Sequence, residues 1–101
     1  MNDRELLELA AKAAGIDLDD ISKRMKDDWA DFWNPLTDDG DALRLAVKLG
    51  MRLEIDNEWN RTHAQIIPDQ PWFTSPHNED HYAATRLAIV RAAAEIGRAM
   101  P

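Results

Sequence analysis

Two stretches near the ends of the chain repeat apolar residues every three or four positions, which is the period of an amphipathic helix. The first covers residues 3–14, where Asn2 supplies a capping side chain and Gly15 ends the pattern. The second covers residues 80–99, where many alanines favour helix formation and close packing. We therefore expect an opening helix and a closing helix, with Tyr82 on the apolar stripe of the closing one.

A third helical pattern lies in the middle of the chain, over residues 38–49. Thr37 is placed to cap its start, and Gly50 is placed to end it. Apolar residues fall on two of its faces, which predicts burial on more than one side. One face carries Leu43, Ala46 and Val47, and the other carries Leu45 and Leu49.

The segment between the first two helices, residues 16–36, leaves two alternatives open. Its apolar residues keep helical spacing: Leu18, Ile21, Met25, Trp29 and Phe32. Asn34-Pro35 would end such a helix, and an irregular or extended path is the other alternative. On a helix, Trp29 and Trp33 would be neighbours one turn apart, so at least one of them is expected to pack inward.

From residue 51 onward the apolar period changes to two, which predicts a half-buried strand over residues 51–55. Residues 56–58 are suited to a turn, and residues 61–67 are suited to return as a partner strand. Three prolines then indicate an irregular loop through residue 77. An isolated hairpin is marginally stable, so this one needs a helix against one face or further strands.

These elements predict an α+β fold, with three or four helices packed around a small antiparallel sheet in a sandwich-like single domain covering residues 1–101. With 45% hydrophobic residues, 31% charged residues and a net charge of −7, the composition is that of a soluble globular protein. The absence of cysteine excludes disulfide scaffolds, thiol catalysis and cysteine-type zinc sites. No apolar run approaches the roughly 18 residues that cross a bilayer, and no signal-peptide pattern is present, so we expect a cytoplasmic protein without membrane contact.

Two longer strings carry a resemblance to a known family. They are WNPLTDDGDALRLAVKLG at residues 33–50 and YAATRLAIVRAAAEIGRAM at residues 82–100. Together with the opening NDRELLELAAKAAG, they resemble the small phage and prophage proteins described as the phage ABA sandwich domain. The resemblance implies a sandwich of helices around a small sheet, encoded by a bacteriophage or prophage, so the expected cytoplasm is that of a bacterial host cell. Residues 51–77 depart from the family pattern, and the resemblance supplies no catalytic residues.

An acidic run is the strongest chemical feature of the sequence. Between Asp17 and Asp41 there are nine aspartates and three basic residues, which accounts for −6 of the net charge of −7. One interpretation is a surface that steers toward a basic partner, with aromatic residues as anchors. The other is a solvated helix face above core aromatics. The candidate partner-binding residues are Asp27, Asp28, Trp29, Asp31, Trp33, Asp38, Asp39, Asp41 and, from the proline-rich loop, Trp72.

Other polar clusters give weaker signals. His77 and His81 are spaced to share a helix face and bind zinc, with His63 as a third ligand, but capping at a helix start explains the same pattern. The arginines of the closing helix are too widely spaced for a basic face, so no direct binding to nucleic acid is expected. No catalytic motif is present, and we expect neither a cofactor nor enzymatic activity.

Three functions remain as hypotheses. The first is a non-catalytic antagonist of a host defence system, of the anti-CRISPR or anti-restriction type, that blocks a basic surface of a host protein or protein complex. The second is a small-molecule or nucleotide binder, or a metal-assisted hydrolase, built around the histidines and the tryptophan-rich loop. The third is an oligomeric phage accessory protein, such as a homodimer that pairs the alanine-rich closing helix across a two-fold axis.

Overall fold

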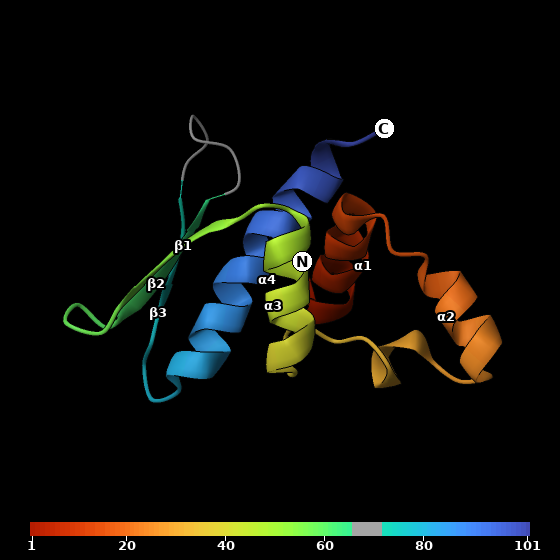
Figure 1. Ribbon diagram of the computed structural model, residues 1–101, viewed down its shortest axis with the longest axis horizontal. Coiled ribbons are helices and arrows are strands. Elements are labelled where there is room, and N and C mark those ends of the chain that lie inside the picture. Colours follow the sequence, from red (N-terminus) through yellow and green to blue (C-terminus); the bar gives the residue numbers. More distant parts are fainter. Residues whose placement is uncertain (66–71) are drawn as a thin grey trace.

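The computed structural model describes residues 1–65 and 72–101 and has an α+β fold (Figure 1). These residues form four α-helices, a turn of 3-10 helix and a three-stranded antiparallel sheet. In chain order the elements are α1 (Asp3–Ala14), α2 (Leu18–Met25), η1 (Trp29–Asp31), α3 (Asp39–Lys48), β1 (Arg52–Asp56), β2 (Arg61–Gln65), β3 (Phe73–Pro76) and α4 (His81–Ala99). The long helix α4 lies at the centre, with the sheet on one side and α1 and α3 on the other (Figure 1).

Helix boundaries follow local capping chemistry. The Asn2 side chain accepts a hydrogen bond from the Glu5 amide at the start of α1, and Gly15 ends α1 in a left-handed conformation with φ of 71°. The cap expected at Thr37 is wrong by one residue. The Asp38 carboxylate accepts from the Asp41 amide at 2.8 Å, because an ionised oxygen is the stronger acceptor for the exposed amides of a helix start.

Residues 16–36 follow a broken path instead of one long helix. Helix α2 ends at Met25, since Lys26 adopts a left-handed conformation with φ of 56°. The chain then turns back, and the Trp29 amide donates to the Ser22 hydroxyl at 2.9 Å. Both alternatives held open by the sequence are therefore partly right, because a short helix is followed by an irregular segment.

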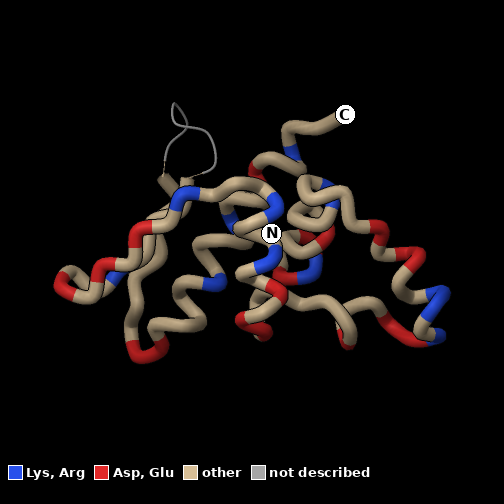
Figure 2. Tube along the Cα trace, viewed as in Figure 1, with Lys and Arg blue, Asp and Glu red and all other residues tan. Residues whose placement is uncertain are grey.

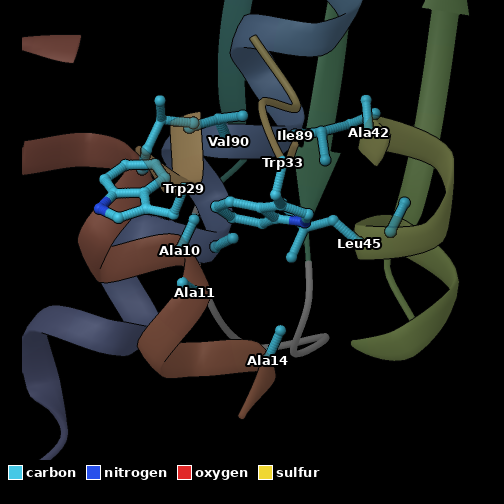
Figure 3. Close-up of a cluster of buried hydrophobic side chains, with 12 residues drawn as sticks. Ala10, Ala11, Ala14, Trp29, Trp33, Ala42, Leu45, Ile89 and Val90 are labelled. Carbon is cyan, nitrogen blue, oxygen red and sulfur yellow. The ribbon is translucent and has the colours of Figure 1, made fainter. Parts of the chain in front are cut away.

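The two tryptophans of this segment form the centre of the main core (Figure 3). Trp29 is 6% exposed and Trp33 is 9% exposed, with their ring centroids 6.4 Å apart. They fill the space between α1, α3 and α4, beside Leu45 and Ile89. Aromatic side chains carry a large share of core burial energy, so this pair fastens the irregular segment to the three helices.

Helices α1 and α4 cross at very short range. A Cβ atom added to Gly97 would overlap the carbonyl oxygen of Leu9 and lie 2.7 Å from its carbonyl carbon. Small residues on both helices permit this approach, and Ala10 and Ala93 are completely buried. Five alanines of α4 are thus covered within the chain, by α1 on one side and by the sheet on the other: Ala84, Ala88, Ala92, Ala93 and Ala94. Pairing of this helix across a two-fold axis stays a prediction.

The sheet contains the predicted hairpin and one strand more. In the hairpin, Leu53 lies opposite Ala64, and the Asp56 carboxylate accepts hydrogen bonds from the amides of the following turn. The loop predicted through residue 77 is wrong for Phe73–Pro76, which form β3 against β2. Pro76 has no N–H to donate, and a strand at the sheet edge tolerates that loss. Residues 66–71, which include the end of the predicted partner strand, lie outside the described residues.

Candidate functional site

An apolar groove lies between β1, α3 and the first half of α4. We call it the β1 groove, a cavity of about 610 Å³ that opens to solvent. Helix α4 forms its floor, and β1 and α3 form its two walls. Its apolar lining consists of Ala42, Leu43, Leu53, Ile55, Tyr82 and Ile89.

Strand alternation explains why β1 turns apolar residues toward this groove. Leu53 and Ile55 lie opposite Ala64 and Thr62, which are both completely buried beneath α4. All four residues therefore share the inward face of the sheet. Yet Ile55 remains 55% exposed, because β1 is an edge strand and α3 stands apart from it.

Helix α3 and the start of α4 also present large apolar residues to solvent, against the expectation from the sequence. Leu43, Val47 and Tyr82 are 61%, 72% and 71% exposed. The core face of α3 consists of Ala42, Leu45 and Ala46. The prediction that both apolar faces of α3 are buried is wrong, because α1 and α4 lie on the same side of the helix and nothing in the described residues covers the other.

Exposed carboxylates from four segments gather along one edge of the molecule. Figure 2 shows acidic positions in the α2–η1 connection, in η1, at the start of α3 and in the turn before α4, all along the lower side of the view. The cations of α2 lie at one end of this row. We call this row the acidic edge and define it by Asp27, Asp31, Asp38, Asp39, Glu79 and Asp80, all of which are exposed.

Two of the other candidate aspartates serve the fold. Asp41 is buried; one of its carboxylate oxygens accepts from the Asn34 amide at 2.9 Å, and the other accepts from Arg44 at 2.7 Å. Asp28 accepts two hydrogen bonds from Arg4, each of 3.2 Å. These bonds lower the pKa of Asp28 and raise that of Arg4. The Arg4 guanidinium also lies 4.6 Å from the ring centroid of Trp29.

The aromatic anchors proposed from the sequence lie elsewhere. Trp29 and Trp33 belong to the core, so the expectation that they contact a partner is wrong. Trp72 is 38% exposed and lies edge-on to His63, with ring centroids 6.1 Å apart. His63 follows Thr62 in β2, so it points to the outer face of the sheet, away from the β1 groove. The apolar surface residues of the groove replace the tryptophans as candidate anchors.

The histidines do not come together as a metal site. His77 is 1% exposed and stacks on His81, with ring centroids 4.5 Å apart, whereas His63 is on the opposite face of the sheet and bonds to Thr74. Within residues 1–65 and 72–101, no group of three or more potential ligand side chains is placed to hold a metal ion.

His77 instead belongs to a buried hydrogen-bond chain. The Thr85 hydroxyl donates to the His81 carbonyl oxygen at 2.8 Å, so it accepts from the Thr62 hydroxyl at 2.9 Å. Thr62 must then accept from Nε2 of His77, at 2.8 Å. The Nδ1 atom carries the remaining lone pair and is buried without a hydrogen-bond partner. Burial, together with the neighbouring His81, lowers the pKa of His77.

Comparison with known proteins finds no relative. No family model matches the chain, and no curated protein or solved structure is significantly similar to it. In the part of the chain that the structure describes, no helix has both the length and the apolar character needed to cross a membrane.

Proposed function

We propose that this protein is a non-catalytic binding protein that docks a positively charged protein on its acidic edge and the adjoining β1 groove. The observation that carries the proposal is the gathering of exposed carboxylates from four separate segments along one side, beside an open apolar groove. Such an arrangement supplies long-range attraction from the charges and burial energy from the apolar surface.

The polar clusters around Asp41 and His77 favour a structural role over a catalytic one. Each carboxylate oxygen of Asp41 accepts a hydrogen bond, one from the Asn34 amide and one from Arg44, and these bonds hold the start of α3. The one free ring nitrogen of His77 is closed off from solvent. Catalysis requires a reactive group within reach of a substrate, so neither cluster favours an enzymatic function.

A sharper version of the proposal follows from the resemblance to phage ABA sandwich proteins. In that version the protein is made by a bacteriophage or prophage and acts in the host cytoplasm. Its partner is a host defence protein with a basic surface, in the manner of an anti-CRISPR or anti-restriction protein. The carboxylates would occupy a channel that normally holds nucleic acid, and the bulk of the protein would block access to it.

Affinity capture with matched charge variants tests the proposal. The tagged protein is incubated with bacterial lysate at low and moderate salt, and captured proteins are identified by mass spectrometry. Asp27→Lys combined with Asp31→Lys reverses two charges on the acidic edge. Glu8→Lys combined with Glu58→Lys makes the same change in net charge at exposed positions outside that edge.

We expect one stoichiometric complex that weakens as salt rises, that is lost in the first double variant and that persists in the second. Attraction between exposed charges is screened beyond about 8–10 Å at moderate salt, which is why the complex should be salt-sensitive. Equal loss in both double variants would mean that net charge alone drives capture, and capture of nothing would refute the proposal.

A further inference from the structure

The β1 groove is adjacent to an unpaired strand edge. In the described residues β1 pairs with β2 alone, so its other side presents N–H and C=O groups without strand partners. Of the three strands, only β1 contributes residues to the groove lining. The cavity therefore opens at the free side of β1, between that strand and α3.

We propose that this groove binds an extended segment of a protein partner, which adds to the free edge of β1 as a fourth strand. The inference rests on the proposed binding function and names the kind of segment that the site accepts. In this arrangement the added strand lies on α4 between β1 and α3, and alternate side chains point down into the groove. Strand addition of this type gains main-chain hydrogen bonds along the edge and specificity from the seated side chains.

The two sheet edges are not equally suited to this role. Strand β3 ends in Pro76, whose nitrogen cannot donate a hydrogen bond. Strand β1 contains no proline, and its inward residues Leu53 and Ile55 still expose apolar surface. A strand beside β1 would cover that surface, together with Leu43 on the opposite wall.

Charge at the mouth of the groove specifies the polar residues of the segment. Asp39, Glu79 and Asp80 line the groove together with a single cation, Arg86. The guanidinium of Arg86 is already engaged, since it donates to the Leu36 carbonyl oxygen at 2.8 Å and to Asp39 at 2.6 Å. The mouth is therefore net negative. A segment that alternates apolar residues with lysine or arginine matches both the groove and its mouth.

The same charge argues against a second copy of this chain as the occupant. Pairing of two β1 edges would bring two acidic mouths together, on molecules that each carry −7. A basic segment of a different protein has the opposite sign and is favoured.

Amide shifts in NMR spectra test the inference on the intact protein. The probe is a synthetic eight-residue peptide that alternates valine and lysine, and its control alternates valine and glutamate. Valine–lysine peptide should shift the amides of Arg52–Asp56 and of the groove-lining residues of α3 and α4. The glutamate peptide should shift none of them. No shift with the lysine peptide at millimolar concentration would overturn the inference.

Alternate N-methylation of the peptide distinguishes strand pairing from simple occupation of the groove. A strand adding to one edge uses the N–H groups of every second residue only. Methylation of the alternate amides that face β1 should therefore abolish binding, and methylation of the other alternate set should leave binding nearly unchanged. Equal affinity of both methylated peptides would refute the added strand.

Helix α3 offers a matched pair of protein variants. Leu43 lines the groove, whereas Val47 is an exposed apolar residue of the same helix that does not. We expect Leu43→Lys to weaken peptide binding about tenfold, since it removes one buried apolar contact and adds a repelling charge. Val47→Lys should change binding less than about twofold, within the range of an uninvolved surface position. Equal effects of the two variants would overturn the inference.

The same pair separates this inference from the proposed function. A lysate complex that survives Leu43→Lys but is lost with Asp27→Lys and Asp31→Lys would keep the proposed function and refute the groove segment. If neither the unmodified protein nor any variant captures a partner, the proposed function is refuted. The peptide titration would still show whether the groove binds an extended segment.

Discussion

The contact between α1 and α4 and the surface around β1 use apolar residues in opposite ways. In the first region alanine and glycine are completely covered, and the two backbones lie so close that Gly97 has no room for a Cβ atom. In the second region Leu43, Ile55 and Tyr82 each have more than half of their surface exposed. Of these two regions, the helix contact thus covers small residues, and the surface around β1 leaves large ones facing solvent.

This difference separates two roles of apolar residues. Burial of small residues yields little transfer energy per side chain, but it allows close packing and many dispersion contacts. Large residues that stay exposed contribute no burial energy to the stability of the free protein, and contiguous exposed apolar patches are characteristic of binding sites. The first region holds the fold together, and the second is where we place the partner.

Two leucines of the same helix should show the largest difference between the two regions. Leu45 is 2% exposed and Leu43 is 61% exposed. We expect Leu45→Ala to lower the free energy of unfolding by about 2–5 kcal/mol, because it removes buried carbons and leaves a cavity. Leu43→Ala should change it by less than about 0.5 kcal/mol. Urea unfolding of both variants measures the difference, and similar losses would mean that the groove face is part of the core.

A second pair tests the close crossing of α1 and α4. Gly97→Ala should lower the free energy of unfolding by about 1–3 kcal/mol, since the helices must separate to admit the new methyl group. Gly40→Ala in α3 is the control, because the three atoms nearest its Cβ would be side-chain atoms of Arg44 and Asp38, at 3.2 Å. Alanine is also the better helix former by about 1 kcal/mol, so the control should be neutral or stabilising. In thermal unfolding, the melting temperature of Gly97→Ala should therefore fall, whereas that of Gly40→Ala should stay the same or rise.

The sequence predicted the elements whose signals are local. Capping residues and the apolar period place α1, α3 and α4, and strict alternation places β1, because each signal lies within a few residues of the element that it defines. Strand β3 has four residues and ends in proline, so it carries no local signal of its own. It exists through pairing with β2, which is a contact that a local pattern does not record.

The candidate site was harder to predict for a related reason. Periodicity identified two apolar faces on α3, but the choice of which face is covered depends on where α1 and α4 pack. The pattern alone therefore predicts that the face of Leu43 and Val47 is core, although a surplus of large apolar residues on a short helix is also the signal of a binding face. For the tryptophans, helical spacing predicts that at least one packs inward, and the structure buries both, so their use as partner contacts is the part that is wrong. A glycine inside the alanine-rich α4 was the one available sign of the close helix contact.

A change of pH offers a milder test. The buried hydrogen-bond chain of His77, Thr62 and Thr85 joins β2 to α4, and Thr85 also lines the β1 groove. Burial and His81 lower the pKa of His77, and Asp56 opposes them more weakly. The unfolded chain therefore binds a proton at a higher pH than the folded chain does. Stability contributed by neutral His77 is complete above a pH of about 6.5 and is lost progressively as the pH falls below that value.

We expect the melting temperature to fall between about pH 7.5 and about pH 5.5, before most carboxylates titrate. His77→Gln keeps an N–H donor for Thr62 and should flatten this slope, even if its stability at neutral pH is lower. His63→Gln, on the outer face of the sheet, is the control that should retain the slope. Hydrogen exchange should locate the loss: protection at Thr62 in β2 should decrease in acid before protection of the α1–α4 contact does. If acid instead weakens both regions equally, the groove end and the close helix contact belong to one cooperative unit, and the comparison between them holds for exposure but not for stability.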